Sequence, residues 1–350
     1  MDLPKGNGDL LRKLFQSYKR RDNQAFDFFA HQIVENERQK RHNVLADDLE
    51  RILEGNLQTG IRKLPLGNTV DYRDLPRDRE RDHPLVEVHS TNRTSYDMIL
   101  SEENRCTLDA ILHEYRRGDI LRTHGLSPRR RLLFCGPPGC GKTLCAHVIA
   151  HELELPLLYV RFDSVISSYL GETSANLRKV FDFAGRGDWV ILFDEFDAIG
   201  KNRDDPSEHG ELKRVVNSFL QMLDGFVSDS IIIAATNHER ALDTALWRRF
   251  DEIVYMGLPE RPQVRALLER KLAAVRHDHV DLSRFTRQMV GATYADIERA
   301  CQDAMKICFL GNRRELTSDD LKVAWERHKR RLEIITSTVT LVEENEGEEN

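Results

Sequence analysis

The sequence lacks several features that would assign it to other classes of protein. Its 350 residues include six cysteines but no Cys-x-x-Cys pair, so neither a disulfide scaffold nor a cysteine-ligated metal site is indicated. No apolar run approaches the roughly 20 residues that span a bilayer, and the first residues do not resemble a secretory signal. We therefore expect a cytoplasmic protein without a membrane span, whose cysteines serve as small buried apolar residues.

Recognisable protease motifs are also absent. Neither His-Glu-x-x-His nor Gly-x-Ser-x-Gly occurs, so any proteolysis would require a separate partner. There are 58 acidic and 52 basic residues, and the net charge of −6 weighs against nucleic acid as the main partner, although a local basic run stands at 129–131. With 40% hydrophobic and 31% charged residues, the chain is typical of a globular protein with two or three compact units.

A phosphate-binding loop is the strongest motif that is present. Residues 136–143 read Gly-Pro-Pro-Gly-Cys-Gly-Lys-Thr, between a short apolar strand at 132–134 and a predicted helix at 143–153. The glycines let consecutive backbone N–H groups curl around phosphates, and the helix points its positive end at them. The predicted nucleotide-binding residues are Gly136, Pro137, Pro138, Gly139, Cys140, Gly141, Lys142, Thr143, Leu144 and Asp194.

A second motif follows about fifty residues later, where 191–195 read Ile-Leu-Phe-Asp-Glu. Lys142 adds positive charge at the outer phosphates, while the Thr143 hydroxyl and the Asp194 carboxylate are predicted to hold Mg²⁺. Glu195 is then free to orient the attacking water. The two motifs together predict a protein that binds ATP or GTP with Mg²⁺ and hydrolyses it.

Short apolar strands alternate with helices in the middle of the chain. The strands are predicted at 132–135, 157–162, 189–193, 231–235 and 253–256. Such continuous apolar runs, separated by helices, are typical of a parallel sheet covered on both faces. Ser101 is the expected N-cap of the helix that leads into this α/β region. After residue 258 only helices are predicted, at 261–276, 294–310 and 318–332, the last with a capping box from Thr317 to Asp320.

These patterns divide the chain into five parts. Residues 1–55 are predicted to form a small helical module, 56–94 a linker, 95–257 a large α/β subdomain, 258–335 a helical lid and 336–350 an acidic tail. The end of this tail, at 343–350, is expected to be disordered. The helical module fits a role in substrate recognition and a role as packing helices equally well.

From about Ser95 to Arg331 the chain resembles the AAA family of ATPases. The resemblance rests on the phosphate loop, on Asp194 with Glu195, and on the order of strands and helices. It implies a P-loop NTPase fold with a parallel five-stranded sheet in the order 5-1-4-3-2 and a C-terminal helical lid. It also implies a homohexameric ring with ATP bound between neighbouring copies.

Further segments are similar to catalytic segments of that family. Asn237, which ends the run Ala-Ala-Thr-Asn, resembles the sensor residue that positions the attacking water, and the alternative is an asparagine in a turn. Arg249 resembles the arginine finger that acts in a neighbour's site, with Arg248 as the second candidate. The alternative is an exposed arginine pair bound to Asp243 or Asp251.

Tyr169, Leu170 and Gly171 match the family's first pore loop, in which an aromatic residue grips an extended polypeptide. The alternative is a tyrosine that only packs. Ala295 stands where the protein-remodelling branch also has alanine and where clamp loaders have an arginine, which favours a polypeptide substrate over DNA. Tyr294 departs from the glycine that is usual in that branch.

Three functions are compatible with these residues. The leading hypothesis is an ATPase ring that unfolds or dismantles protein substrates through its pore. The second is an ATP-gated switch that controls a partner protein. The resemblance to stand-alone bacterial AAA proteins suggests a separate protease and phage defence as the setting for such a switch, but no motif here reports either. The third, a nucleic-acid motor, is disfavoured by the acidic balance and by Ala295.

Overall fold

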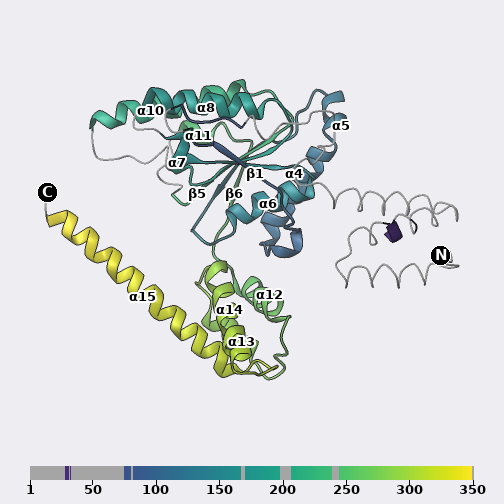
Figure 1. Cartoon of the computed structure of the whole chain (residues 1–350), viewed down its shortest axis with the longest axis vertical. Helices are drawn as coiled ribbons and strands as arrows, with labels where there is room; N and C mark the ends of the chain where they lie inside the picture. Colours follow the sequence, from purple (N-terminus) through teal and green to yellow (C-terminus); the bar gives the residue numbers. More distant parts are fainter. Residues whose placement is uncertain are drawn as a thin grey trace. The chain divides into compact units, whose positions relative to one another are not determined.

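The computed structural model describes residues 28–30, 32, 75–79, 82–166, 170–197, 206–238 and 244–348 (Figure 1). The chain divides into two compact units, Met1–Thr69 and Val70–Asn350. The predicted module at 1–55 lies outside the described residues, apart from 28–30 and 32, which are helical. Its extent and the other predicted domain boundaries stay predictions.

A six-stranded sheet forms the centre of the second unit. Its strands are β1 (Val86–His89), β2 (Arg131–Cys135), β3 (Leu157–Val160), β4 (Val190–Phe193), β5 (Ile231–Thr236) and β6 (Glu252–Tyr255). They lie in the order β1-β3-β4-β5-β2-β6. The strands β2 to β6 are parallel, and when read from β6 they have the predicted order 5-1-4-3-2.

Strand β1 corrects the expectation of five strands. It lies in the segment 56–94 that the sequence predicts to be a linker, and it pairs antiparallel with β3, with Val86 opposite Val160. Leu85 and Val86 are fully buried there. The strand reads only Val-Glu-Val-His and follows a dense mixture of charges at 71–83, so its alternation is too short to be recognised from periodicity.

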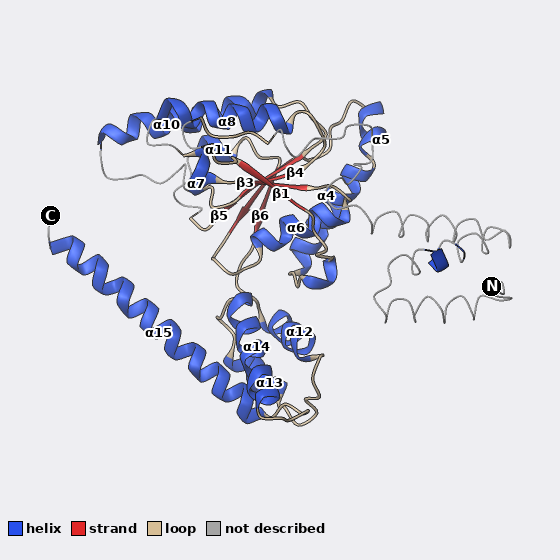
Figure 2. Ribbon diagram, in the orientation of Figure 1, coloured by secondary structure: helices blue, strands red, loops and turns tan. Residues whose placement is uncertain are grey.

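Helices cover both faces of the sheet (Figure 2). On one face α8 (Leu170–Ala184) and α10 (Pro206–Gly225) pack on the strands through aromatic rings such as Phe181 and Phe219. On the other face lie α4 (Glu102–Arg116) and α6 (Lys142–Glu152). Every residue of β4 and β5 is buried, as expected for strands covered on both sides.

Shorter elements join these layers. They are η2 (Ser95–Asp97), α5 (Gly118–Thr123), α7 (Phe162–Val165) and α11 (Thr244–Trp247). The Ser101 hydroxyl accepts a hydrogen bond from the backbone N–H of Asn104 at 3.2 Å, which confirms the predicted N-cap of α4. Five cysteines are buried as expected, but Cys106 is exposed because it lies on the outer face of α4, away from the buried Leu108 and Ile111.

Four helices follow the sheet: α12 (Arg261–Leu272), α13 (Leu282–Gln288), α14 (Tyr294–Leu310) and α15 (Ser318–Glu348). They enclose an apolar core of their own, which includes Leu268, Phe285 and Trp325. The short helix α13 is absent from the sequence prediction. α15 continues to Glu348, so residues 343–348, expected to be disordered, are helical; no glycine or proline interrupts 318–346.

The predicted capping box at the start of α15 is present. The carboxylate of Asp320 accepts hydrogen bonds from the backbone N–H and the hydroxyl of Thr317, at 2.9 and 2.7 Å. Arg313 donates to both carboxylate oxygens, at 2.7 and 2.6 Å. This hydrogen-bonded guanidinium lowers the pKa of the buried Asp320 from 3.8 to about 2.

We expect Asp320→Asn to lower the free energy of unfolding by about 1 to 2 kcal/mol, the usual cost of losing a cap. Asp319→Asn changes an exposed carboxylate one residue away and is the matched control. Because folding lowers the pKa of Asp320, its contribution is complete above about pH 4 and is lost as the pH falls through about 2. Thermal denaturation at pH 7 and pH 2.5 should show the wild type and Asp320→Asn converging; a constant difference would contradict the assignment.

Candidate functional site

The loop between β2 and α6 has a backbone that only glycine accommodates readily. Gly136, Gly139 and Gly141 have φ angles of 134°, 74° and 91°. A Cβ on Gly136 would lie 2.2 Å from the carbonyl oxygen of Met256, so the backbone directly after β6 approaches the loop too closely for any side chain. α6 begins after Gly141 without a side-chain cap, which leaves its first N–H groups available to an anion.

Lys142 places a buried cation inside this loop. Its ammonium group donates hydrogen bonds to the carbonyl oxygens of Gly136 and Pro137, at 2.7 and 2.8 Å. The residue is only 6% exposed, so its charge acts where water screens it weakly. Cys140 in the same loop is buried, and desolvation raises the pKa of its thiol, which argues against a reactive thiolate.

A hydrogen bond joins the two nucleotide motifs. The Thr143 hydroxyl donates to Oδ2 of Asp194 at 2.6 Å, and Oδ1 of Asp194 accepts from the backbone N–H of Glu195 at 2.9 Å. Both residues follow strands that end at the same edge of the sheet, because β5 pairs in parallel with β2 and with β4. A hydroxyl and a carboxylate in contact are oxygen donors suited to Mg²⁺, so these residues fit the predicted metal site.

Two more predicted residues follow β4 and β5. Glu195 is exposed and has a φ of 51°, an uncommon backbone conformation for a residue other than glycine. Asn237 is half-buried directly after β5. Thr236 supports this corner, because its buried hydroxyl donates to Asp197 at 3.2 Å and accepts from the backbone N–H of His238 at 3.0 Å.

The first turn of α14 packs directly on the phosphate loop. The backbone N–H of Ala295 donates to the carbonyl of Gly139 at 3.1 Å, and a Cβ on Gly139 would lie 2.9 Å from the Thr293 hydroxyl. Tyr294 is half-buried, and desolvation raises the pKa of its phenol to about 12. Sequence reasoning missed Thr293 and also Met98, whose Cε would lie 3.8 Å from a Cβ on Gly141. The only sequence signal for these contacts is the glycine content of the loop.

Of the two arginines after α11, Arg249 has a partner that the sequence does not predict. Nε of Arg249 donates to Asp224 at 2.8 Å, near the end of α10, and both side chains are about two-fifths exposed. Asp251, one of the expected partners, instead accepts hydrogen bonds from the backbone N–H groups of Arg130 and Arg131. The other, at position 243, lies outside the described residues, and Arg248 is exposed.

The predicted pore loop is only partly described. Tyr169 lies outside the described residues. Leu170 and Gly171 lie in the first turn of α8.

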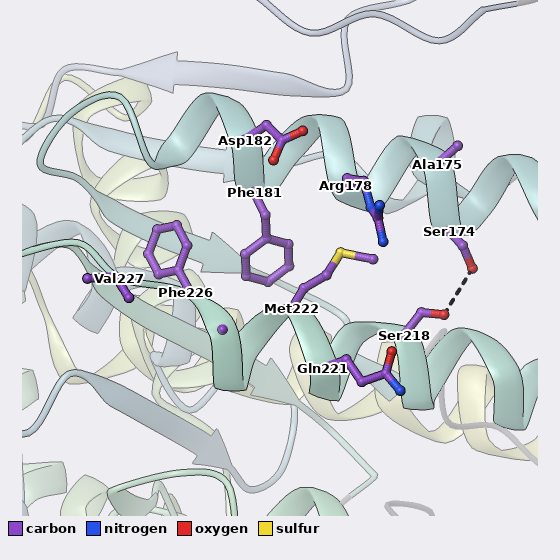
Figure 3. Close-up of a pocket in the computed structure, with 11 residues that line it drawn as sticks. Ser174, Ala175, Arg178, Phe181, Asp182, Ser218, Gln221, Met222, Phe226 and Val227 are labelled. Carbon is purple, nitrogen blue, oxygen red and sulfur yellow. Dashed lines mark hydrogen bonds between the residues drawn. The ribbon is translucent and has the colours of Figure 1, made fainter.

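A groove of about 590 Å³ lies between α8 and α10, outside the phosphate loop (Figure 3). Phe181, Met222 and Phe226 form its apolar part. The hydroxyl of Ser174 donates to that of Ser218 at 3.4 Å across it. Its lining also includes the charged residues Arg178 and Asp182.

Comparison with known proteins identifies the family. Residues 132–258 match the ATPase family associated with various cellular activities (AAA). An uncharacterized AAA family ATPase of Sinorhizobium fredii, y4kL, is 41% identical over 325 residues, which cover 93% of this chain and 96% of that protein. The chain belongs to the AAA family. It is therefore an ATPase with a nucleotide-binding P-loop fold.

Two other relatives carry functional names. The ATP-dependent zinc metalloprotease FtsH 3 of Sphaerobacter thermophilus is 32% identical across 71% of this chain. The proteasome-activating nucleotidase of Methanopyrus kandleri is 30% identical across 72% of it. The matches span 52% and 60% of these relatives, so the likeness concerns only part of each. Within the described part of this chain, no helix is sufficiently long and apolar to cross a membrane.

We expect Gly139→Ala to weaken nucleotide binding at least about tenfold, because its methyl group would push Thr293 and Ala295 away from the loop. Gly125→Ala is the matched control: φ is 73° there against 74° at Gly139, but a Cβ at Gly125 meets no atom within 4 Å. Both changes impose similar backbone strain of about 1 to 2 kcal/mol. Titration with a fluorescent ATP analogue should therefore separate them, and equal affinities would contradict the role of this contact.

Proposed function

We propose that this AAA ATPase binds ATP with Mg²⁺ at residues 136–143 and hydrolyses it to drive the remodelling of protein substrates by a homohexameric ring. The hydrogen bond between Thr143 and Asp194, beside a loop of left-handed glycines and a buried lysine, is the observation that carries the nucleotide site. It supports the proposal because it joins two oxygen donors beside a buried cation, the groups that phosphate chemistry requires.

Each residue has a distinct part in the proposed reaction. Backbone N–H groups of the loop and the first turn of α6 bind the phosphates, and Lys142 neutralises the outer ones. Thr143 and Asp194 hold Mg²⁺, which supplies further neutralisation of the phosphate charge when bound. Glu195 orients a water molecule for attack, and Asn237 helps to position it. The exposure of Glu195 suits this role, because a carboxylate that solvent reaches can contact a water molecule.

Arg249 completes the site of a neighbouring copy in this proposal. Because exposed ion pairs are weak, the partly exposed guanidinium can exchange Asp224 for a phosphate, which carries more negative charge. A positive charge at the transferring phosphoryl group is worth about 10³ to 10⁵ in rate in related chemistry. Arg248 is the second candidate for this role.

The same ring would act on polypeptides through its centre. Tyr169 would grip an extended chain in the pore, with Leu170 and Gly171 at the start of α8. Support comes from the relatives whose names are those of a protease and of a nucleotidase that activates the proteasome. α8 also packs on β4 through Phe181 and Phe193, and Asp194 directly follows β4, so the proposed metal ligand and the helix after the pore loop adjoin the same strand.

The second candidate function is an ATP-gated switch that controls a partner protein without threading it. The zinc metalloprotease among the relatives favours a separate protease as that partner. Tyr169→Ala separates the two functions, and Tyr169→Phe, which keeps the aromatic ring, is the control. If the ring threads its substrate, Tyr169→Ala should abolish the unfolding of a protein that co-purifies with the ATP-bound ring, whereas Tyr169→Phe should retain it. ATP hydrolysis should persist in both variants. Persistent unfolding by Tyr169→Ala would favour the switch.

We expect Glu195→Gln to bind ATP with near-normal affinity but to hydrolyse it at least about 10²-fold more slowly, because a glutamine cannot accept the water's proton. Lys142→Ala, by contrast, should lose both ATP binding and ATP hydrolysis. Glu154→Gln is the matched control, since Glu154 is also exposed and has a φ of 55°. Phosphate release and ATP titration measure the two effects, and normal turnover by Glu195→Gln would refute its role.

Mixing two inactive variants tests whether sites are shared between copies. Glu195→Gln and Arg249→Ala should each lower ATP hydrolysis strongly when assayed alone. At a 1:1 ratio, about a quarter of the interfaces in a random ring pair an intact Glu195 with an intact Arg249, so hydrolysis should return to about that fraction of the wild-type rate. Arg248→Ala alone should retain most of its activity. A mixture with no recovery would show that Arg249 does not act across an interface.

A further inference from the structure

The long helix α15 continues after its packing partner ends. Where the burial of its side chains is described, its buried residues are Asp320, Leu321, Ala324, Trp325 and His328, in the lid core or beside it. Nε2 of His328 lies 2.9 Å from Oδ1 of Asp296, which belongs to the first turn of α14. α15 has therefore passed along the whole of α14 by His328, and residues 329–348 continue the helix beyond that point (Figure 1).

Six apolar residues of α15, together with His328, follow the heptad repeat of a coiled coil. Intervals of four and three residues alternate along one series: Leu321, Trp325, His328, Leu332, Ile335, Val339 and Val342. A period of 3.5 residues keeps these positions on a single seam when two helices wind around each other. The lid buries the first three positions of this seam. The next, Leu332, is 37% exposed, although it is apolar.

The charges on either side of the seam positions 332–342 define the direction of pairing. Four basic residues precede it, at 327, 329, 330 and 331, and five glutamates follow it, at 343, 344, 346, 348 and 349. The seam is also symmetric about Ser337, since an antiparallel partner sets Leu332 opposite Val342 and Ile335 opposite Val339. Antiparallel pairing brings each basic block against an acidic one, whereas parallel pairing sets like charges side by side.

We propose that residues 329–348 of α15 form an antiparallel coiled coil with the same segment of a second copy of this chain. The mirror symmetry of the seam is what a two-fold axis between identical helices requires. Packing in the lid nucleates the helix before any partner arrives, so pairing does not carry the full cost of helix formation. Four seam positions give a weak contact, which is strengthened when several copies are held in one assembly. The inference does not rest on the nucleotide site.

Two neighbouring isoleucines provide a matched test of the seam. Ile335 belongs to the heptad series, whereas Ile334 lies off it and is 65% exposed. In sedimentation equilibrium without nucleotide, Ile335→Asp should weaken self-association of the full chain at least about tenfold, and Ile334→Asp by less than about twofold. Equal effects of both variants, no effect of Ile335→Asp, or no self-association of the wild type up to millimolar concentration would each overturn the proposal.

Disulfide trapping tests the direction. Two protein preparations are made in a Cys106→Ser background, which removes the exposed cysteine. One carries Ile335→Cys, the other carries Val339→Cys, and the two are mixed before oxidation. Antiparallel pairing predicts that oxidation of the mixture yields mainly the disulfide between the two preparations. Disulfides mainly within each preparation would indicate a parallel pair and contradict the proposal, as would an absence of disulfides. Added salt should also weaken the wild-type association, because opposite charges face each other.

Discussion

The parallel pairing of β5 with both β2 and β4 is the constraint on which the site depends. It aligns the carboxyl ends of three strands at one edge of the sheet, so that Thr143 and Asp194, 51 residues apart in sequence, share a hydrogen bond of 2.6 Å. Every residue of β5 is buried, and a shift of its register would separate these groups. The apolar core and the phosphate chemistry therefore depend on the same backbone ladder.

The lid is joined to this edge through the first turn of α14. Ala295 contacts the loop at Gly139, while Asp296 contacts α15 at His328. Burial opposes the ionised form of Asp296, but hydrogen bonds from Thr293 and His328 outweigh it and leave the pKa below its usual value. One helical turn thus lies between the phosphate loop and the C-terminal helix. A displacement of the loop has a short route to the surface that we propose for pairing.

Much of the site could be predicted because its chemistry is local in sequence. The spacing of residues 136–143 and the run 191–195 identified the loop and the Thr143–Asp194 pair, and continuous apolar strands indicated the parallel sheet. The contact between Thr293 and Gly139, and that between Arg249 and Asp224, join segments distant in sequence and leave no periodic signal. β1 could not be predicted because four residues of alternation are too few. The full length of α15 could not be predicted because a glutamate-rich chain end is typical of disorder as well as of a helix.

The central claim is that ATP is bound in sites shared by neighbouring copies of a ring. The most direct measurement is the mass of the Glu195→Gln protein by light scattering on a sizing column, with ATP, with ADP and without nucleotide. An Ile335→Asp background removes any contribution from α15. A shift to about six subunits with ATP, reversed with ADP, is the predicted result. A monomer in all three conditions would leave Arg249 no neighbouring site to act on and would contradict the account.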